Sequence, residues 1–359
     1  MLFRILRQRL ALLVSSCVLG LGAPAQGAGA VDAQAWPTST PAAQGMDAKA
    51  LETIRQDLPV SFADLRSVVV VKNGVLVFEY RRPGLAPDGL DEMQSVTKSV
   101  VSALFGLALQ DGALTTLDVP FVKYLPANAG APDDRRARDI TLRHLLNLTA
   151  GYRQESRTDR LMRKVGLKTP LQTAMDRDVV SPPGTAFAYD DVTCYITSAV
   201  LTSATRRNAA DYAAERLFGP LGITQFSWPT DRWNVSSGHS GLMLKARDMA
   251  RFGQLYLQNG QWGGRQLLSE AYVLESTREQ SPGRPHERYG YMWWVAPNAV
   301  GRAPFTARGH GGQHIHVDPA FKLVVVTTAE PTQESDARRQ AHKLIYERIV
   351  PAAKGPAAR

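Results

Sequence analysis

Strand-forming segments occur at both ends of this 359-residue chain, and most helix-forming segments lie between them. Two apolar, largely β-branched runs within 65–80 flank Asn73-Gly74, a pair that strongly favours a hairpin. The strand pattern returns at 289–295, 305–308, 314–318 and 323–328. Helical spacing is found at 47–58, 95–109, 142–148, 192–201, 209–217, 246–257 and 338–350. This order predicts an α+β fold in which both chain ends form one sheet around a helical lobe, with a cleft at the junction.

The first thirty residues have the order of a secretory signal peptide: three arginines, an apolar run over 10–22, and small residues up to Ala30. We therefore expect export, to the periplasm or as a secreted protein, rather than a buried N-terminal helix. Cys17 offers a lipid-attachment site, but the apolar run continues past it, which favours plain cleavage. No segment approaches the ~20 apolar residues of a membrane span, so no integral membrane segment is expected.

The charge pattern argues against a nucleic-acid-binding protein, and the cysteine content argues against a disulfide-stabilised one. The net charge of +9 is scattered, without a long basic run or alternating basic and aromatic residues, so no nucleic-acid surface is expected. Cys17 and Cys194 are the only cysteines, so a chain without its leader has no internal disulfide. Cys194 lies beside the apolar stretch 195–201 and is expected to be a buried small residue rather than a nucleophile.

The first candidate for chemistry is Ser95-Val96-Thr97-Lys98, at the start of an apolar helix. A spacing of three residues places Ser95 and Lys98 on one helix face, where the amine can act on the hydroxyl. The helix start also offers free backbone amides for a developing oxyanion. The alternative is an N-cap serine with an incidental lysine, since the short pattern is weak by itself. No G-x-S-x-G nucleophile elbow occurs in the sequence.

A second candidate is Tyr189, which follows Pro182-Pro183-Gly184 and precedes a helix. A phenol in such a loop can act as a general base when a nearby ammonium stabilises its anionic form. By itself, a tyrosine at such a position is more often a packed aromatic residue.

The third candidate is the glycine-rich segment 308–313, Arg-Gly-His-Gly-Gly-Gln. Glycines allow a substrate to lie close against a strand edge, and the Gln313 amide could complete an oxyanion hole. The next strand places His314, His316 and Asp318 on one face, which is acceptable metal-ligand chemistry. No H-E-x-x-H occurs, so we interpret these three residues as a solvated or hydrogen-bonded surface rather than a metal site.

The three motifs, in this order, resemble the serine β-lactamase and penicillin-binding-protein superfamily, specifically its class C β-lactamase and esterase-like branch. That family has S-x-x-K on a helix, Y-x-N on the helical lobe and K-T-G or H-x-G on a strand, matched here by Ser95-Lys98, Tyr189 and His310-Gly311-Gly312. The resemblance covers 46–350 and is closest to 6-aminohexanoate-dimer hydrolases and related carboxylesterases. It implies a β-lactamase-like fold, with an antiparallel sheet flanked by helices and an inserted helical lobe.

One residue departs from the family pattern, because Asp191 stands where the family has asparagine. A carboxylate near Lys98 would hold the amine protonated, which disfavours neutral Lys98 as the base and favours Tyr189. The E-x-x-L-N motif of class A β-lactamases is missing.

The sequence therefore predicts an exported serine hydrolase that cleaves a small-molecule amide or ester through an acyl-enzyme on Ser95. Lys98 and Tyr189 are the other catalytic residues, and the backbone amides of Ser95 and Gln313 would bind the oxyanion. No metal or organic cofactor is expected. The alternatives are a β-lactamase or D-alanyl-D-alanine peptidase, and a catalytically silent binding protein of the same fold, which Asp191 favours.

Substrate contacts are expected from Asp191, His310, Gly311, Gly312 and Trp293. Cleft lining and core packing remain open for Trp294, Tyr291 and Trp233, and a place beside the cleft remains open for His239. The expected organisation is a signal peptide over 1–30, an extended arm over 31–45, a hydrolase domain over 46–351 and a tail over 352–359. Within the domain, the sheet lobe comprises 46–90 and 285–351, and the helical lobe comprises about 110–280.

Overall fold

A computed structural model describes residues 36–154, 169–297, 299, 301–330 and 336–355. These residues belong to one compact unit, which begins at Trp36. The expected signal peptide, Cys17 and the first part of the expected arm lie outside the described residues. None of the described helices is long and apolar enough to cross a membrane.

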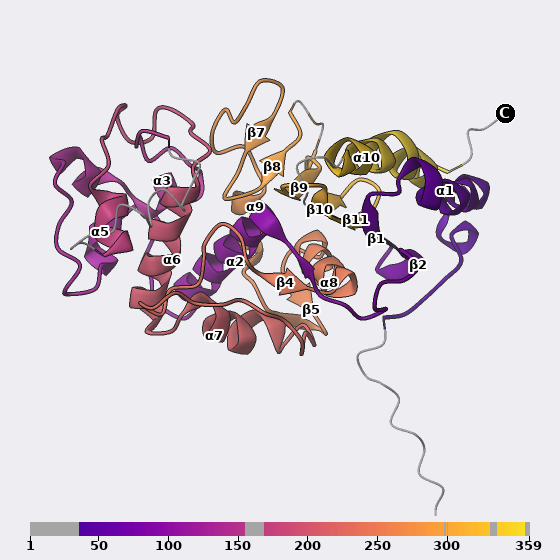
Figure 1. The fold of residues 1–359 in the computed structure, drawn as a ribbon, viewed down its shortest axis with the longest axis horizontal. Helices are drawn as coiled ribbons and strands as arrows, with labels where there is room; N and C mark the ends of the chain where they lie inside the picture. The colour runs from indigo at the N-terminus through magenta and orange to yellow at the C-terminus, as the bar shows by residue number, and fades with distance from the viewer. Residues whose placement is uncertain (1–35, 155–168, 298, 300, 331–335, 356–359) are drawn as a thin grey trace, which may run out of the picture. The chain divides into compact units, whose positions relative to one another are not determined.

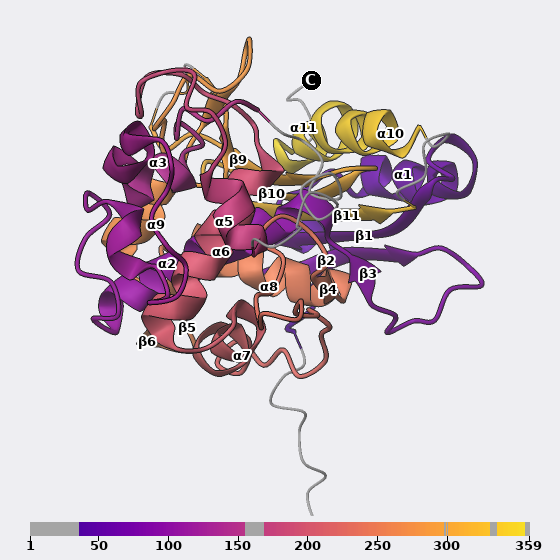
Figure 2. The ribbon, with the colours of Figure 1, turned by 60° about the vertical axis from the view of Figure 1, so that its left-hand side comes forward.

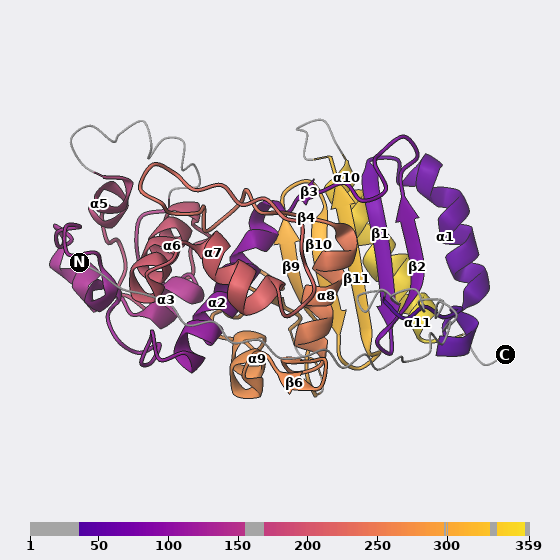
Figure 3. The same cartoon turned by 90° about the horizontal axis from the view of Figure 1, so that it is seen from below.

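A seven-stranded antiparallel sheet joins the two ends of the chain, with the order β2-β1-β11-β10-β9-β8-β7. Strand β1 lies between β2 and β11, so an early strand and the last strand are neighbours (Figure 3). Two small sheets, β3-β4 and β5-β6, are separate. The strands are β1 Leu65–Lys72, β2 Val75–Arg81, β3 Asp91–Glu92, β4 Met243–Leu244, β5 Gln261–Trp262, β6 Arg265–Gln266, β7 Arg288–Tyr289, β8 Trp294–Val295, β9 Phe305–Gly309, β10 Gln313–Asp318 and β11 Leu323–Ala329.

The first hairpin forms as its sequence predicts. Asn73 and Gly74 connect β1 and β2 with positive φ angles of 54° and 83°, which a tight two-residue turn between antiparallel strands requires. Glycine and asparagine tolerate this conformation better than other residues, because their side chains cause little clash there.

The helices lie on both faces of the sheet and in a separate region beside it (Figure 1). The α-helices are α1 Ala48–Ser61, α2 Thr97–Gln110, α3 Leu142–Leu146, α5 Pro170–Met175, α6 Asp191–Thr205, α7 Ala209–Ala213, α8 Ala246–Leu257, α9 Glu270–Ser276, α10 Ala337–Lys343 and α11 Val350–Ala353. The short 3₁₀ helices are η1 Ala42–Gln44, η2 Gln94–Val96, η3 Phe121–Tyr124 and η4 Arg135–Asp139, and the π-helical segments are η5 Ala214–Phe218 and η6 Leu344–Ile349.

Alternation along β1 divides the core into two halves. Val68 and Val70 face the helices from the two chain ends, whereas Val69 and Val71 belong to the larger core that includes α8 and α2. Successive side chains of a strand point to opposite faces, so a strand with both faces covered is apolar throughout. Figure 2 shows α1 and α10 on one side of the sheet and α8 on the other.

Two details differ from the expected organisation. Helix α8 falls within the range expected for the helical lobe, yet it packs against β1, β10 and β11, because its apolar face is needed to cover the sheet. At the C-terminus, Ala352 and Ala353 are buried in the core, so the expected tail begins with residues that belong to the folded domain.

Candidate active site

The candidate nucleophile lies where the sheet meets the helical region. Ser95 is in the short turn η2, and Lys98 is in the first turn of α2, the most deeply buried helix of the core. The Lys98 amine donates a hydrogen bond of 2.9 Å to Ser95 Oγ, so the expected proximity of the two side chains is confirmed. Just before the serine, Gln94 has a positive φ of 49°, which is uncommon for a residue with a side chain and turns the backbone sharply into η2.

Asp191 forms an ion pair with the Lys98 amine. Its carboxylate accepts a hydrogen bond of 2.7 Å from Lys98 Nζ, and the side chain of Lys98 is 1% exposed. Burial acts to lower the pKa of the Lys98 amine, but Tyr189, Cys194 and Asp191 act together to raise it, and the result lies above its ordinary value. Of these three groups, Asp191 is the one that accepts a hydrogen bond from the amine, and burial raises the pKa of the Cys194 thiol to about 12, which keeps the thiol neutral. Lys98 is therefore a charged donor at neutral pH.

Tyr189 is held above this ammonium by aromatic packing. The Lys98 nitrogen lies 4.7 Å from the centroid of the Tyr189 ring. The ring also stacks on Trp294, with centroids 5.6 Å apart and an angle of 21° between the ring planes. The Tyr189 ring is therefore held between the Lys98 ammonium and the Trp294 ring.

The segment after Tyr189 is anchored by an ion pair. Asp190 caps α6 by accepting from the backbone of Val192 and Thr193, and Arg177 donates to the same carboxylate at 2.8 Å. Asp190 is buried and its neighbour Asp191 is only half-buried, so alternate residues face the helical region and the site. This capped helix start therefore sets the positions of both Tyr189 and Asp191.

A cavity of about 650 Å³ opens beside these groups, and Ser95, Tyr189, Trp294, Gly309 and His310 line part of it. Gly309 must be a glycine for a local reason: a Cβ atom there would lie 2.5 Å from the Met93 carbonyl oxygen. The end of β9 can therefore approach the turn that carries Ser95.

The expected role of Gly311 and Gly312 in substrate binding is not supported. Both glycines are buried in the turn from β9 to β10, with φ angles of 75° and 97°. A Cβ on Gly312 would meet the Ala337 backbone at 2.7 Å, which shows that this glycine packs against the start of α10. These residues shape the turn, whereas His310 lines the cavity.

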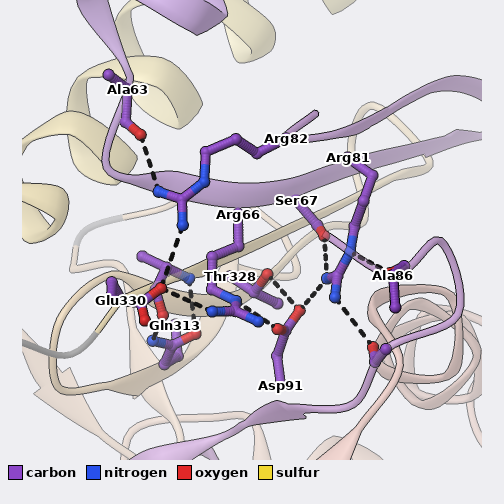
Figure 4. A network of polar contacts seen from close by, with 12 residues as sticks. Ala63, Arg66, Ser67, Arg81, Arg82, Ala86, Asp91, Gln313, Thr328 and Glu330 are labelled. Atoms are coloured by element: carbon purple, nitrogen blue, oxygen red, sulfur yellow. Dashed lines mark hydrogen bonds and ion pairs between the residues drawn. The ribbon is translucent and has the colours of Figure 1, made fainter. Parts of the chain in front are cut away.

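The assignment of Gln313 to the oxyanion hole is wrong. Its side chain donates to the Ala329 carbonyl at 2.8 Å and accepts from the Ala329 amide at 3.0 Å (Figure 4). Its backbone pairs with Gly309 within the sheet, and the residue is completely buried. Gln313 therefore fixes β10 to β11 and cannot reach a bound substrate.

The expected substrate contact of Trp293 is also wrong, because its neighbour Trp294 is the tryptophan that lines the cavity. Trp293 is completely buried and stacks on Phe252, with ring centroids 5.9 Å apart. Tyr291 is likewise buried in the core. Trp294 lines the cavity and Trp233 is half-buried elsewhere. Adjacent side chains of a strand point in opposite directions, and the sequence does not say which of two tryptophans points inward.

His314, His316 and Asp318 on β10 are buried, so their interpretation as surface residues is wrong. The two imidazoles lie next to hydroxyl groups, His316 Nδ1 at 2.9 Å from Thr306 and His314 Nδ1 at 3.3 Å from Thr327. Burial lowers the pKa of both histidines to about 3, so both are neutral. Within the described part of the chain, no group of three such side chains is arranged to hold a metal ion.

His239 lies near Lys98, but its backbone carbonyl rather than its ring contacts the Lys98 amine. The His239 carbonyl accepts from Lys98 Nζ at 3.5 Å, and its ring lies 3.0 Å from Ser237 Oγ. Burial and the positive charge of Lys98 lower the pKa of His239 to about 4, so the imidazole is neutral at pH 7.

A second charged cluster, which the sequence motifs did not indicate, lies just before the nucleophile (Figure 4). Asp91 accepts from Arg66 at 2.7 Å, from Arg81 at 2.5 Å and from Thr328 at 2.8 Å. Its carboxylate is buried, and the donors come from the β1–β2 hairpin and from β11, which is far from that hairpin in sequence. Such a cluster could be found only from the strand pairing.

An antiparallel sheet beside a helical region, with a serine and a lysine at the junction, defines the β-lactamase-like fold, which a class of serine hydrolases shares. The chain belongs to the Beta-lactamase family, whose family model matches residues 66–347. It is 23% identical over 313 residues to the 6-aminohexanoate-dimer hydrolase of Paenarthrobacter ureafaciens, covering 80% of this chain and 79% of that protein.

Solved structures of low sequence identity support the same fold. The Beta-lactamase/D-alanine Carboxypeptidase of Yersinia pestis has a TM-score of 0.69 at 16% identity, covering 88% of this chain and 100% of that chain. The hydrolase EstCE1 has a TM-score of 0.66 at 17% identity, covering 86% of this chain and 98% of that chain. The fold and family expected from the motifs are therefore confirmed.

Proposed function

We propose that this protein cleaves an amide or ester through an acyl-enzyme on Ser95, in the manner of a 6-aminohexanoate-dimer hydrolase or a carboxylesterase. The observation that carries the proposal is the Lys98 amine, which bonds to both Ser95 and Asp191 below the ring of Tyr189. The similarity to the Paenarthrobacter hydrolase supports the same class of reaction.

Acylation begins with removal of the hydroxyl proton of Ser95. Lys98 remains charged because of Asp191 and stabilises negative charge, and Tyr189, acting in its phenolate form, accepts the proton as general base. Ser95 Oγ forms a bond to the substrate carbonyl carbon, and the carbonyl oxygen becomes an oxyanion. Tyr189 then gives the proton to the leaving amine or alcohol as the bond to the carbonyl carbon breaks. Water then attacks the acyl carbonyl: the phenolate of Tyr189 takes one proton from the water and returns it to Ser95 Oγ as the bond between Ser95 Oγ and the acyl carbon breaks.

The oxyanion requires two donors, and Gln313 supplies neither. We assign the backbone amides of Ser95 and His310 to this role. Both residues line the cavity, and η2, which contains Ser95, packs against β9, the strand that ends directly before His310. Removal of one oxyanion donor typically costs about 10²- to 10³-fold in rate.

Covalent labelling tests this proposal directly. A fluorophosphonate should add one phosphonyl group to the wild-type protein and none to Ser95→Ala, and mass spectrometry of the peptide containing residue 95 locates the adduct. Short-chain 4-nitrophenyl esters, a linear amide and a β-lactam then rank the substrate classes. An unlabelled wild-type protein that hydrolyses none of them would support the alternative of a binding protein.

We also propose that the protein acts after export, which the arginine-rich and apolar leader supports. Expression of the full chain should yield a mature protein whose N-terminus follows Ala25 or Ala30. Recovery of the intact leader on a cytoplasmic product would overturn this proposal.

A further inference from the structure

Glu92 is the last residue of the short strand β3 and comes shortly before the candidate nucleophile. Its neighbour Asp91 is buried and bonded to the arginines of the sheet, whereas Glu92 is only half-buried. Successive side chains of a strand point in opposite directions, so the two carboxylates serve different parts of the molecule. Glu92 forms no ion pair with any residue in the described part of the chain, and its oxygens accept from neutral donors instead.

The Glu92 carboxylate connects two segments that are distant in sequence. One oxygen, Oε2, accepts a hydrogen bond of 2.6 Å from the side-chain amide of Gln94, in the turn that carries Ser95. The other, Oε1, accepts a hydrogen bond of 3.2 Å from the backbone amide of Gly241. The loop that contains Gly241 leads into β4, the strand that pairs with β3 (Figure 2). One carboxylate therefore ties the turn of the nucleophile to the loop 237–241.

Gln94 needs such an anchor because its backbone is strained. Its φ of 49° lies in the left-handed region, which is unfavourable for a residue with a Cβ atom and persists only where the surroundings hold it. On one side Gln94 packs closely against β9, since a Cβ atom on Gly309 would lie 3.0 Å from the Cβ atom of Gln94. Glu92 holds the side-chain amide of the same residue. The residue directly before Ser95 is therefore fixed through its side chain as well as through its backbone.

The same loop contributes to the surroundings of Lys98. The His239 carbonyl accepts a hydrogen bond of 3.5 Å from Lys98 Nζ. The amine also donates to Ser95 Oγ at 2.9 Å and to Asp191 at 2.7 Å. An ammonium has three protons to donate, so these three acceptors use all of them. Two of the three lie on the segments that Glu92 joins.

We propose that Glu92 is a positioning residue, whose two hydrogen bonds hold Ser95 and the loop 237–241 in place around the catalytic amine. The inference rests on the proposed acyl-enzyme function and adds a residue that does not itself line the cavity. A displacement of about 1 Å between reacting groups can cost about 10²-fold in rate. Glu92 acts through geometry rather than through its charge, because neither of its two donors is charged.

Two variants separate geometry from charge. Glu92→Gln keeps both links, because its carbonyl oxygen can accept from Gly241 and its amide can donate to Gln94 once the Gln94 amide is flipped. Glu92→Ala loses both. With a 4-nitrophenyl ester, kcat/KM should fall about 10- to 100-fold in Glu92→Ala and stay within about threefold of the wild-type value in Glu92→Gln. The rate constant for labelling Ser95 with a fluorophosphonate should change in the same way, because it depends on the same nucleophile.

Glu79→Ala is the matched control, because Glu79 is another half-buried glutamate, pairs with Arg247 and does not line the cavity. It should leave kcat/KM and the labelling rate unchanged. An equal loss in this control would show a general effect and overturn the positioning role. Wild-type rates in Glu92→Ala, or a Glu92→Gln variant as slow as Glu92→Ala, would also overturn it.

A second variant covers the case in which Glu92→Ala does not fold. Gln94→Ala removes only the link to the turn of the nucleophile, so both rates should fall about 3- to 10-fold. Rates equal to those of the wild-type protein would show that this link does not position Ser95.

Hydrogen–deuterium exchange keeps the two proposals separate, because it requires no substrate. Peptides that cover 93–97 and 238–243 should exchange faster in Glu92→Ala than in the wild-type protein, and at the wild-type rate in Glu92→Gln. Unchanged exchange in Glu92→Ala would overturn the link between the two segments. If the wild-type protein neither hydrolyses an ester nor reacts with the phosphonate, the acyl-enzyme proposal fails, and exchange still decides the link. If the wild-type protein is active and the Glu92 variants keep its rates, the positioning role alone fails.

Discussion

Two buried charge clusters flank the candidate nucleophile, and they differ in how completely their hydrogen bonds are used within the fold. Asp91 has both carboxylate oxygens bonded, to Arg66, Arg81 and Thr328. In the second cluster, the Lys98 amine donates one hydrogen bond to Asp191. It donates another to Ser95, a residue that lines the cavity.

This difference separates a role in stability from a role in chemistry. A buried charge costs free energy unless it is paired, so both clusters need their partners. The Asp91 cluster is closed by strands of the sheet, so its loss is expected to weaken the fold. The Lys98 cluster ends on a hydroxyl that can react, so its loss is expected to weaken catalysis.

The largest expected effect is from Ser95→Ala. Hydrolysis of a 4-nitrophenyl ester should fall by at least about 10⁴-fold, because the nucleophile is lost. Lys98→Ala should be nearly as damaging, and the double variant should be no more than about tenfold worse than either single variant, since residues of one catalytic unit are not additive. Circular dichroism checks that the variants are folded, and a double variant far below both single variants would contradict a shared role.

Tyr189→Phe tests whether the phenol completes the Lys98 cluster. The rate should fall by about 10²- to 10⁴-fold, because the general base is removed while its packing on Trp294 remains. Tyr195→Phe is the matched control, since that phenol bonds to Asp231 at 2.7 Å and does not line the cavity. Equal rates for Tyr189→Phe and the wild-type protein would remove Tyr189 from the mechanism.

Asp91→Asn should act on stability instead. Loss of the charge leaves Arg66 and Arg81 partly buried without their shared anion, which should lower the free energy of unfolding by about 3 kcal/mol. Urea denaturation measures this change. Asp178→Asn breaks the exposed pair with Arg153 and should cost less than about 1 kcal/mol. If the two variants are equally stable, the Asp91 cluster does not have the role described here.

Asp191→Asn should have the smallest effect on rate at neutral pH, with a change of less than about tenfold. It removes one of the charges that raise the pKa of Lys98 and leaves burial, which lowers it, so the pKa of Lys98 falls. Lys98 then loses its proton at a lower pH, and the alkaline loss of activity should move to lower pH. The rate against pH on one ester measures this shift. Activity that rises as Lys98 deprotonates would instead make neutral Lys98 the base.

Local sequence patterns are sufficient to predict the first β-hairpin and part of the candidate active site. The Asn73-Gly74 hairpin and the three-residue spacing of Ser95 and Lys98 depend on short stretches of chain, and both are found as expected. Asp191 was also expected near Lys98, although it comes from another helix, because the order of the motifs indicated the fold.

The errors share one physical cause, which is that side-chain direction depends on partners distant in sequence. Gln313 is bound by Ala329, and Trp293 stacks on Phe252, so both are turned away from the cavity by contacts that no local pattern reveals. The burial of His316 likewise follows from Thr306 on the next strand and from the helices above. Arg284 reaches the site through a loop, with no motif to mark it.

The pairing of β1 with β11 determines when the protein can fold during synthesis. Val69 lies opposite Val326, a separation on the order of 250 residues, so this contact has a very high contact order. Until β11 has been made, the β1–β2 hairpin has an unpaired edge, and the face of α8 that covers the sheet lacks most of its partner. Strand β11, which is synthesised after the other described strands, therefore completes the core around the early strand β1, and a growing chain exposes apolar surface until β11 has been made.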